Sequence, residues 1–114
     1  MSELIEPAAV RGAQQAGRAP TIVDVRGREE YAAGHVAGAL HIPVDQLAGR
    51  LGELPPDRPV VTYCVMRHRG DSRGERAAAL LRERGYDARA LDGGLPAWEA
   101  AGLPVERTPG EGPQ

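Results

Sequence analysis

The sequence predicts an α/β domain in which helices wrap a largely parallel sheet. Short apolar runs rich in β-branched residues recur along the chain, bounded by Pro or Gly, and Ala-rich stretches with helical spacing separate them. Strands that alternate with helices need crossover connections, and a crossover places successive strands in parallel. The 114 residues, of which 41% are hydrophobic, suffice for one domain with one core.

Five segments are predicted to be strands. Three of them are short, β-branched and flanked by turn residues, which is typical of buried strands: residues 21–25 (TIVDV), 39–42 (ALHI) and 60–64 (VVTYC). Residues 88–91 (ARAL) form a weaker fourth strand, and residues 3–5 are expected to form a short edge strand.

Three helices are predicted with modest signals. The first covers residues 8–16, with Pro7 at the first helical position and Gly17 after it. The second covers residues 44–51, and the third covers residues 95–101, which contain the single tryptophan of the chain.

The strongest helix signal lies at residues 73–84. Ser72 and Glu75 have the S-x-x-E spacing of a capping box, in which each side chain bonds the backbone of the other residue. Apolar residues of this segment share one helical face, and Gly85 supplies the C-terminal stop. The sequence therefore places the start of this helix at residue 73.

Composition excludes several classes of protein. A net charge of −2, from 14 basic and 16 acidic residues, argues against binding to nucleic acid by neutralisation of phosphates. A single cysteine excludes internal disulfides and multi-thiolate metal sites, and neither a metal nor a cofactor is expected. No leader-like or membrane-spanning apolar run is visible, so we expect a soluble, cytoplasmic protein with no membrane partner.

The ordered domain is expected to cover residues 5–107. Residues 108–114 are rich in Pro and Gly and contain almost nothing to bury, so this C-terminal tail is expected to be disordered.

Cys64 is the strongest candidate for a chemical role. It ends a predicted strand and precedes a polar segment that leads into the capped helix. Ligands of open α/β sheets bind beyond the carboxyl ends of strands, and a helix N-terminus stabilises anions and lowers the pKa of a nearby thiol. The alternative is that Cys64 is a small hydrophobic residue that closes a buried strand. The position at the strand end favours the chemical role.

Basic residues follow Cys64, namely Arg67, His68, Arg69 and Arg73. For Arg67 or His68 alone, a solvated loop position is at least as good an interpretation as contact with a ligand. Arg73 differs, because a cation at the first turn of a helix opposes the helix dipole. A bound anion would compensate this charge, so Arg73 is predicted to contact a substrate.

A second polar segment follows the strand at residues 21–25. Asp24 and Arg26 could serve catalysis, but we expect an internal ion pair that fixes the following turn. His35 lies between Gly34 and Val36, close to Gly38. It could be a general base or a ligand, but a histidine that bonds the backbone and locks the turn is the preferred interpretation.

These segments resemble the rhodanese family. TIVDVRGREEYAAGHVAGALHIP is similar to its first signature, and VVTYC, RAAALLRERGY and ALDGGLPAWEAAGLPV resemble the rest, in the family order, over about residues 5–105. The resemblance implies a three-layer α/β fold whose mostly parallel five-stranded sheet has helices on both faces.

The resemblance also implies a reaction and roles for individual residues. Active members move a sulfane sulfur from a donor such as thiosulfate, through a persulfide on the loop cysteine, to cyanide or a thiol. Cys64 matches that cysteine. Asp24, Arg26, Glu30 and His35 match structural positions of the signature. The expected partners are a small anionic sulfur donor and a thiol acceptor, with a sulfur-relay protein as a further partner.

The segment after Cys64 departs from the family pattern, which is Cys-x4-Arg with the arginine running into the helix. Arg69 satisfies the spacing, whereas Arg73 satisfies the position at the helix start. Because the capping box sets a late start, we favour an insertion of about four residues in the loop and Arg73 as the family arginine. Arg69, Gly70 and Arg73 are the candidate substrate-binding residues.

Two other functions compete with sulfur transfer. A phosphatase or arsenate reductase would use Cys-x5-Arg, but the sixth residue after Cys64 is Gly70, and no second cysteine could resolve a disulfide. A non-catalytic regulatory or binding module is the other alternative. Inactive members of the family usually lack the cysteine that this chain retains.

Overall fold

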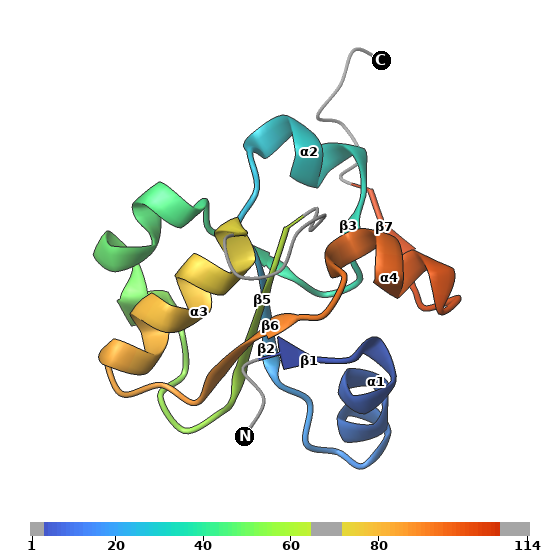
Figure 1. Ribbon diagram of the computed structural model, residues 1–114, viewed down its shortest axis with the longest axis horizontal. Helices are drawn as coiled ribbons and strands as arrows, with labels where there is room; N and C mark the ends of the chain where they lie inside the picture. Colours follow the sequence, from blue (N-terminus) through green and yellow to red (C-terminus); the bar gives the residue numbers. More distant parts are fainter. Residues whose placement is uncertain (1–3, 65–71, 108–114) are drawn as a thin grey trace.

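The fold is built around a parallel sheet. A computed structural model describes residues 4–64 and 72–107 (Figure 1). The five-stranded sheet has the order β1-β6-β5-β2-β4, and every neighbouring pair is parallel. Its strands are β1 (Leu4–Ile5), β2 (Thr21–Asp24), β4 (Leu40–His41), β5 (Val60–Tyr63) and β6 (Ala88–Leu91). The predicted α/β class and its five strands are therefore confirmed.

Each face of this sheet carries its own apolar cluster. Helix α3 (Arg73–Glu83) and two 3₁₀ helices, η1 (Val44–Gly49) and η2 (Leu51–Glu53), cover one face, while α1 (Pro7–Gln15) and α4 (Gly94–Ala100) cover the other (Figure 1). Strand residues alternate between the faces. Val60 and Cys64 therefore pack on the α3 side, whereas Val61 and Tyr63 pack on the α1 and α4 side.

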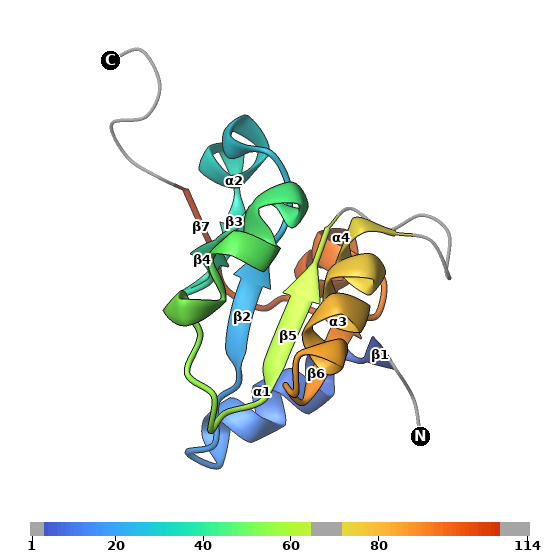
Figure 2. The same ribbon diagram turned by 90° about the vertical axis from the view of Figure 1, so that its left-hand side faces the viewer.

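The carboxyl ends of the central strands point toward one end of the molecule. Figure 2 shows the arrowheads of β2 and β5 directed at the end where α2 (Arg28–Ala33) lies and where α3 begins. Beside them, β3 (His35–Val36) pairs antiparallel with β7 (Val105–Glu106) in a second, two-stranded sheet. The end expected to carry the chemistry is thus framed by α2 and the first turn of α3.

Helix α3 begins where the capping pattern predicted. The Ser72 hydroxyl accepts a hydrogen bond from the Glu75 N–H at 3.0 Å and donates one to Glu75 Oε1 at 3.1 Å. The helix ends before Gly85, whose φ of 92° lies in the left-handed region that favours glycine. Local chemistry alone therefore sets the position of this helix along the chain.

The structure differs from the expectation at the segment 44–51, at helix α2 and at strands β3 and β7, and the sequence signals were weak at each of them. The segment predicted as one helix at residues 44–51 is helical, but as two short 3₁₀ helices, η1 and η2, that break at Arg50. Gly49 and Gly52 weaken a longer α-helix in that segment. Helix α2 was not predicted, although Glu29 and Glu30 lie in its first turn, and the paired β3 and β7 are too short to give a periodic signal.

The first turn of α3 lies directly on the end of β5. A Cβ atom added at Gly74 would lie 3.2 Å from the Tyr63 Cα and 3.4 Å from the Cys64 backbone nitrogen. The buried Thr62 hydroxyl donates to the Gly74 carbonyl at 2.6 Å. A side chain at position 74 would crowd the strand backbone, so glycine favours this close approach, and Gly74 and Thr62 together hold the N-terminal end of α3 against the strand end.

Among the described residues, none of the helices has the length and apolar character needed to cross a membrane.

We predict that Gly74→Ala destabilises the protein, because both atoms that crowd the new methyl group belong to backbone that cannot rotate away. Overpacking costs about 1–3 kcal/mol, and the better helix propensity of alanine returns up to about 1 kcal/mol, so the expected net loss in the free energy of unfolding is up to about 2 kcal/mol, measured by urea denaturation. Gly12→Ala in α1 is the matched control, since a Cβ there meets nothing within 4 Å. That variant should gain up to about 1 kcal/mol from helix propensity. Equal stability of the two variants would contradict the packing argument.

Candidate active site

Cys64 follows β5 directly and faces the α3 layer. Its residue surface is 2% exposed, and its sulfur is a free thiol. Its carbonyl accepts a hydrogen bond from the Leu95 N–H at 3.1 Å, which ties it to the start of α4. Because Gly74 touches the Cys64 backbone, the N-terminal turn of α3 lies beside this residue. A buried thiol and a helix N-terminus are therefore adjacent.

The end of β2 carries a buried ion pair that organises the neighbouring segments. Arg26 Nη2 donates to Asp24 Oδ2 at 2.7 Å, and the Arg26 backbone N–H and Nε donate to Asp24 Oδ1, each at 2.9 Å. Arg26 Nη2 also donates to the carbonyls of Glu30 and Gly34. Although burial lowers the pKa of Arg26, the Asp24 carboxylate holds it above its ordinary value. The ion pair expected from the sequence is thus present, and it fixes both ends of α2.

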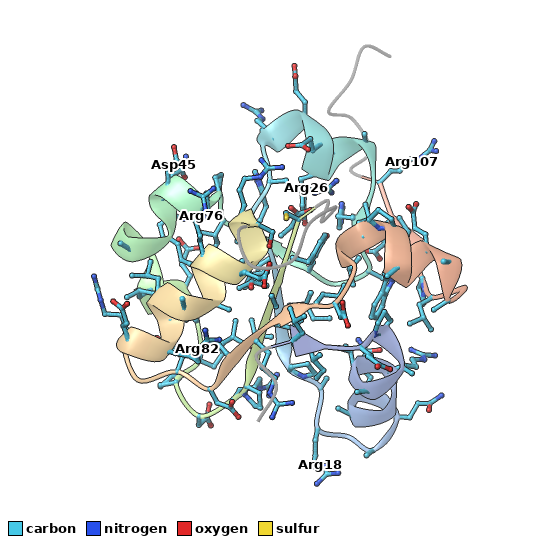
Figure 3. The ribbon with its side chains drawn as sticks, in the orientation of Figure 1. Arg18, Arg26, Asp45, Arg76, Arg82 and Arg107 are labelled. Carbon is cyan, nitrogen blue, oxygen red and sulfur yellow. The ribbon has the colours of Figure 1, made fainter. Side chains whose placement is uncertain are left out.

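Tyr63 links this ion pair to the central strand and to β3. Its hydroxyl donates to Asp24 Oδ2 at 2.8 Å and accepts from the Val36 N–H at 2.9 Å. The Arg26 guanidinium carbon lies 5.6 Å from the centroid of the Tyr63 ring, and Figure 3 shows Arg26 below α2 near the end of β5. Burial, together with the neighbouring Asp24, raises the pKa of Tyr63, so its hydroxyl keeps its proton at neutral pH.

Glu30 bridges α2 and α3. Its Oε1 accepts a hydrogen bond from the Gly27 N–H at 2.9 Å, which caps the start of α2. Arg73 reaches the same carboxylate, with Nη1 at 3.4 Å from Oε1 and Nη2 at 3.5 Å from Oε2. Partial burial raises the pKa of Glu30, but the Gly27 N–H and Arg73 outweigh it and hold that pKa below its ordinary value. Glu30 is therefore ionised at neutral pH beside the first turn of α3.

His35 takes part in a stack of rings next to α2. Its ring lies 3.7 Å from the Tyr31 ring, centroid to centroid, and the Tyr31 ring also stacks on His41 at 4.7 Å. His35 Nδ1 lies 2.7 Å from the Tyr31 carbonyl, and its Nε2 lies 3.8 Å from Oε1 of Glu106 in β7. The side chain bonds the backbone and holds the turn into β3, as the preferred interpretation of the sequence expected.

Of the residues selected from the sequence, the structure joins four in one network. Asp24, Arg26 and Glu30 lie in one hydrogen-bonded group, and Arg73 joins it through Glu30. Arg69 and Gly70 lie outside the described residues, as do Arg67 and His68. The expected insertion after Cys64 and the tail at residues 108–114 lie outside them too.

Three residues of the site were missed by sequence reasoning: Thr62, Tyr63 and Gly74. Thr62 and Tyr63 lie in an apolar run that predicts only a buried strand, and their partners are distant in the sequence. Gly74 did carry a usable signal, because a glycine inside the first turn of a helix costs stability unless close packing requires it.

The described residues show no metal-binding cluster, and one hollow lies away from Cys64. Within residues 4–64 and 72–107, His, Cys, Asp and Glu side chains form no group of three or more that could hold a metal ion. A hollow of about 180 Å³ is lined by Pro59, Val61 and Arg89, among others, at the amino ends of the strands. That hollow lies at the opposite end of β5 from the thiol.

Comparisons with known proteins match most of the chain to one family. A family model described as "Rhodanese-like domain" matches residues 6–101. The HTH-type transcriptional regulator Rv0324 of Mycobacterium tuberculosis is 45% identical over 86 residues, which are 75% of this chain but 37% of the regulator. The thiosulfate sulfurtransferase GlpE of Shewanella oneidensis is 38% identical over 81 residues, which are 70% of this chain and 76% of that protein. The chain therefore spans little more than a third of one relative and most of the other.

Solved structures share the architecture. The crystal structure of a full-length protein from Lactobacillus plantarum superimposes with a TM-score of 0.81 at 30% sequence identity, covering 92% of this chain and 88% of that one. Because the family model matches residues 6–101 and the solved structure shares the fold, the chain belongs to the rhodanese-like domain family.

Proposed function

We propose that this protein is a sulfurtransferase that carries a sulfane sulfur as a persulfide on Cys64. The observation that supports it most is the position of Cys64, at the carboxyl end of β5 and against the first turn of α3. The sulfurtransferase name of one relative, together with the matched family model, agrees with the proposal. Donors are thiosulfate or a related persulfide, and acceptors are a thiol or cyanide.

The reaction needs little besides a thiolate and a site for negative charge. The Cys64 thiolate attacks the outer sulfur of thiosulfate, a new S–S bond forms, and the S–S bond of thiosulfate breaks with its electron pair on sulfite. The resulting persulfide is an anion, and the positive end of the α3 dipole favours negative charge at this position. Attack on sulfur by a preformed thiolate requires no general base.

The second half of the reaction must end on another molecule. The chain has one cysteine, so no internal thiol can take the sulfur from Cys64. An external thiolate or cyanide attacks the outer sulfur of the persulfide, and the Cys64 thiolate leaves. We place this exchange in the reducing cytoplasm, where small thiols are abundant, with a sulfur-relay protein as a further acceptor.

A regulatory role is the second candidate. It is supported by the transcriptional regulator among the relatives, in which the matched region is a minor part of the chain. The two candidates differ in one observable property, which is whether Cys64 turns over sulfur. A phosphatase or arsenate reductase is a weaker alternative, because the spacing after Cys64 fails and no second cysteine is present.

We predict that the purified protein gains the mass of one sulfur atom after incubation with thiosulfate and then forms thiocyanate when cyanide is added. Cys64→Ser should abolish both signals, because the serine hydroxyl is not ionised near neutral pH and forms no persulfide. Intact-mass spectrometry and a thiocyanate assay measure the two steps. Sulfur loading without turnover would favour the regulatory role, and hydrolysis of a phosphate ester without loading would overturn the proposal.

We also predict that Arg73→Ala raises the KM for thiosulfate about 3- to 10-fold, the range expected for removal of one partly exposed cation near a dianion. The physical reason is that Arg73 lies in the turn of α3 that adjoins Cys64. Arg67→Ala is the comparison, since Arg67 alone is equally well interpreted as a solvated residue. Equal, small effects of the two substitutions on KM would show that Arg73 is not the substrate arginine.

A further inference from the structure

Glu30 is a charged residue near the start of α3 to which the proposed reaction assigns no role. Its carboxylate is fixed from two sides, by the Gly27 N–H at 2.9 Å and by the Arg73 guanidinium at 3.4 Å. Arg73 adjoins Gly74, the residue that touches the Cys64 backbone. A negative charge is thus held beside the helix end at which an anionic donor would react.

Among the described residues, the two arginines near Glu30 are both engaged in ion pairs. Arg26 is committed to Asp24, with its side chain 5% exposed. Arg73 is already paired with Glu30, and the two side chains are 36% and 42% exposed. A donor that approaches Arg73 therefore meets the ion pair rather than a free guanidinium.

We propose that Glu30 sets the charge class of sulfur donor at this site, by favouring singly charged thiosulfonate- or persulfide-type donors over the thiosulfate dianion. This inference rests on the proposed sulfurtransferase function. Each negative charge on the donor interacts unfavourably with the Glu30 carboxylate and competes with it for Arg73. A dianion meets this penalty twice, whereas a monoanion meets it once, so the carboxylate discriminates by charge and not by size.

Two donors isolate the effect of donor charge, because both transfer one sulfur atom to Cys64 by the same displacement at sulfur. With thiosulfate, the Cys64 thiolate forms the persulfide and releases sulfite. With the methanethiosulfonate anion, CH₃SO₂S⁻, it forms the same persulfide and releases methanesulfinate, since the S–S bond breaks with its electron pair on the sulfinate. The donors differ in one methyl group in place of one charged oxygen.

The test is the ratio of kcat/KM for thiosulfate to kcat/KM for methanethiosulfonate, compared between the native protein and Glu30→Gln. Glutamine keeps an oxygen that can accept from the Gly27 N–H but removes the charge. The ratio should rise about 3- to 10-fold, the effect of one unit charge at roughly 5–10 Å in a partly solvated site. The rise should shrink at high ionic strength, because salt screens exposed charges.

Glu53→Gln is the matched control. It removes the charge of a carboxylate in η2 that pairs with Arg50, with 2.7 Å between Arg50 Nε and Glu53 Oε2. Both side chains of this pair are exposed to solvent or nearly so. This variant should leave the ratio unchanged. Circular dichroism and the thermal midpoint establish that both variants are folded before kinetics are compared.

The outcomes separate this inference from the function on which it rests. If no donor loads sulfur onto Cys64 in the native protein, the sulfurtransferase proposal fails and the inference falls with it. If both donors load sulfur but Glu30→Gln lowers both rates equally, or changes the ratio independently of salt, Glu30 is only a structural cap and the inference is overturned.

Discussion

The close contact between Gly74 and the end of β5 is the constraint on which the site depends. Helices normally pack on sheets at a separation set by their side chains. The first turn of α3 packs directly on the Tyr63 and Cys64 backbone, because Gly74 has no side chain to hold the two apart. The Thr62 hydroxyl then bonds the Gly74 carbonyl from within the strand. The separation between the Cys64 backbone and the first turn of α3 is therefore set by backbone packing.

A second, polar constraint places α2 relative to this contact. Burying an ion pair is costly unless its remaining donors and acceptors are satisfied. Asp24 and Arg26 meet that condition, since Tyr63 donates to the carboxylate and the carbonyls of Glu30 and Gly34 accept from the guanidinium. The network joins β2 and β5 to the start and end of α2. Glu30 consequently reaches Arg73 on α3, although the two residues lie on elements that are distant in the sequence.

The sequence predicts those features that depend on local chemistry and misses those that depend on distant partners. β-Branched runs predicted the central strands, and Ser72 with Glu75 predicted the start of α3. Both signals come from residues that are close together in the sequence. Helix α2 and the short strands β3 and β7 were missed, since tertiary contacts rather than periodicity maintain them. The roles of Tyr63 and Thr62 were invisible for the same reason: each hydroxyl finds its partner across the fold.

Arg73 shows how a correct electrostatic argument can be incomplete. A cation in the first turn of a helix requires an anion, and the sequence argument assigned that anion to a substrate. The structure supplies one from the chain itself, the Glu30 carboxylate. The same carboxylate also caps α2 by accepting from the Gly27 N–H, so Glu30 is held both by a hydrogen bond that a neutral amide can accept and by an ion pair that requires its charge. The packing of Gly74 on the end of β5 involves neither contact, so the charge near the strand end and the backbone contact that positions the strand end have separate physical origins.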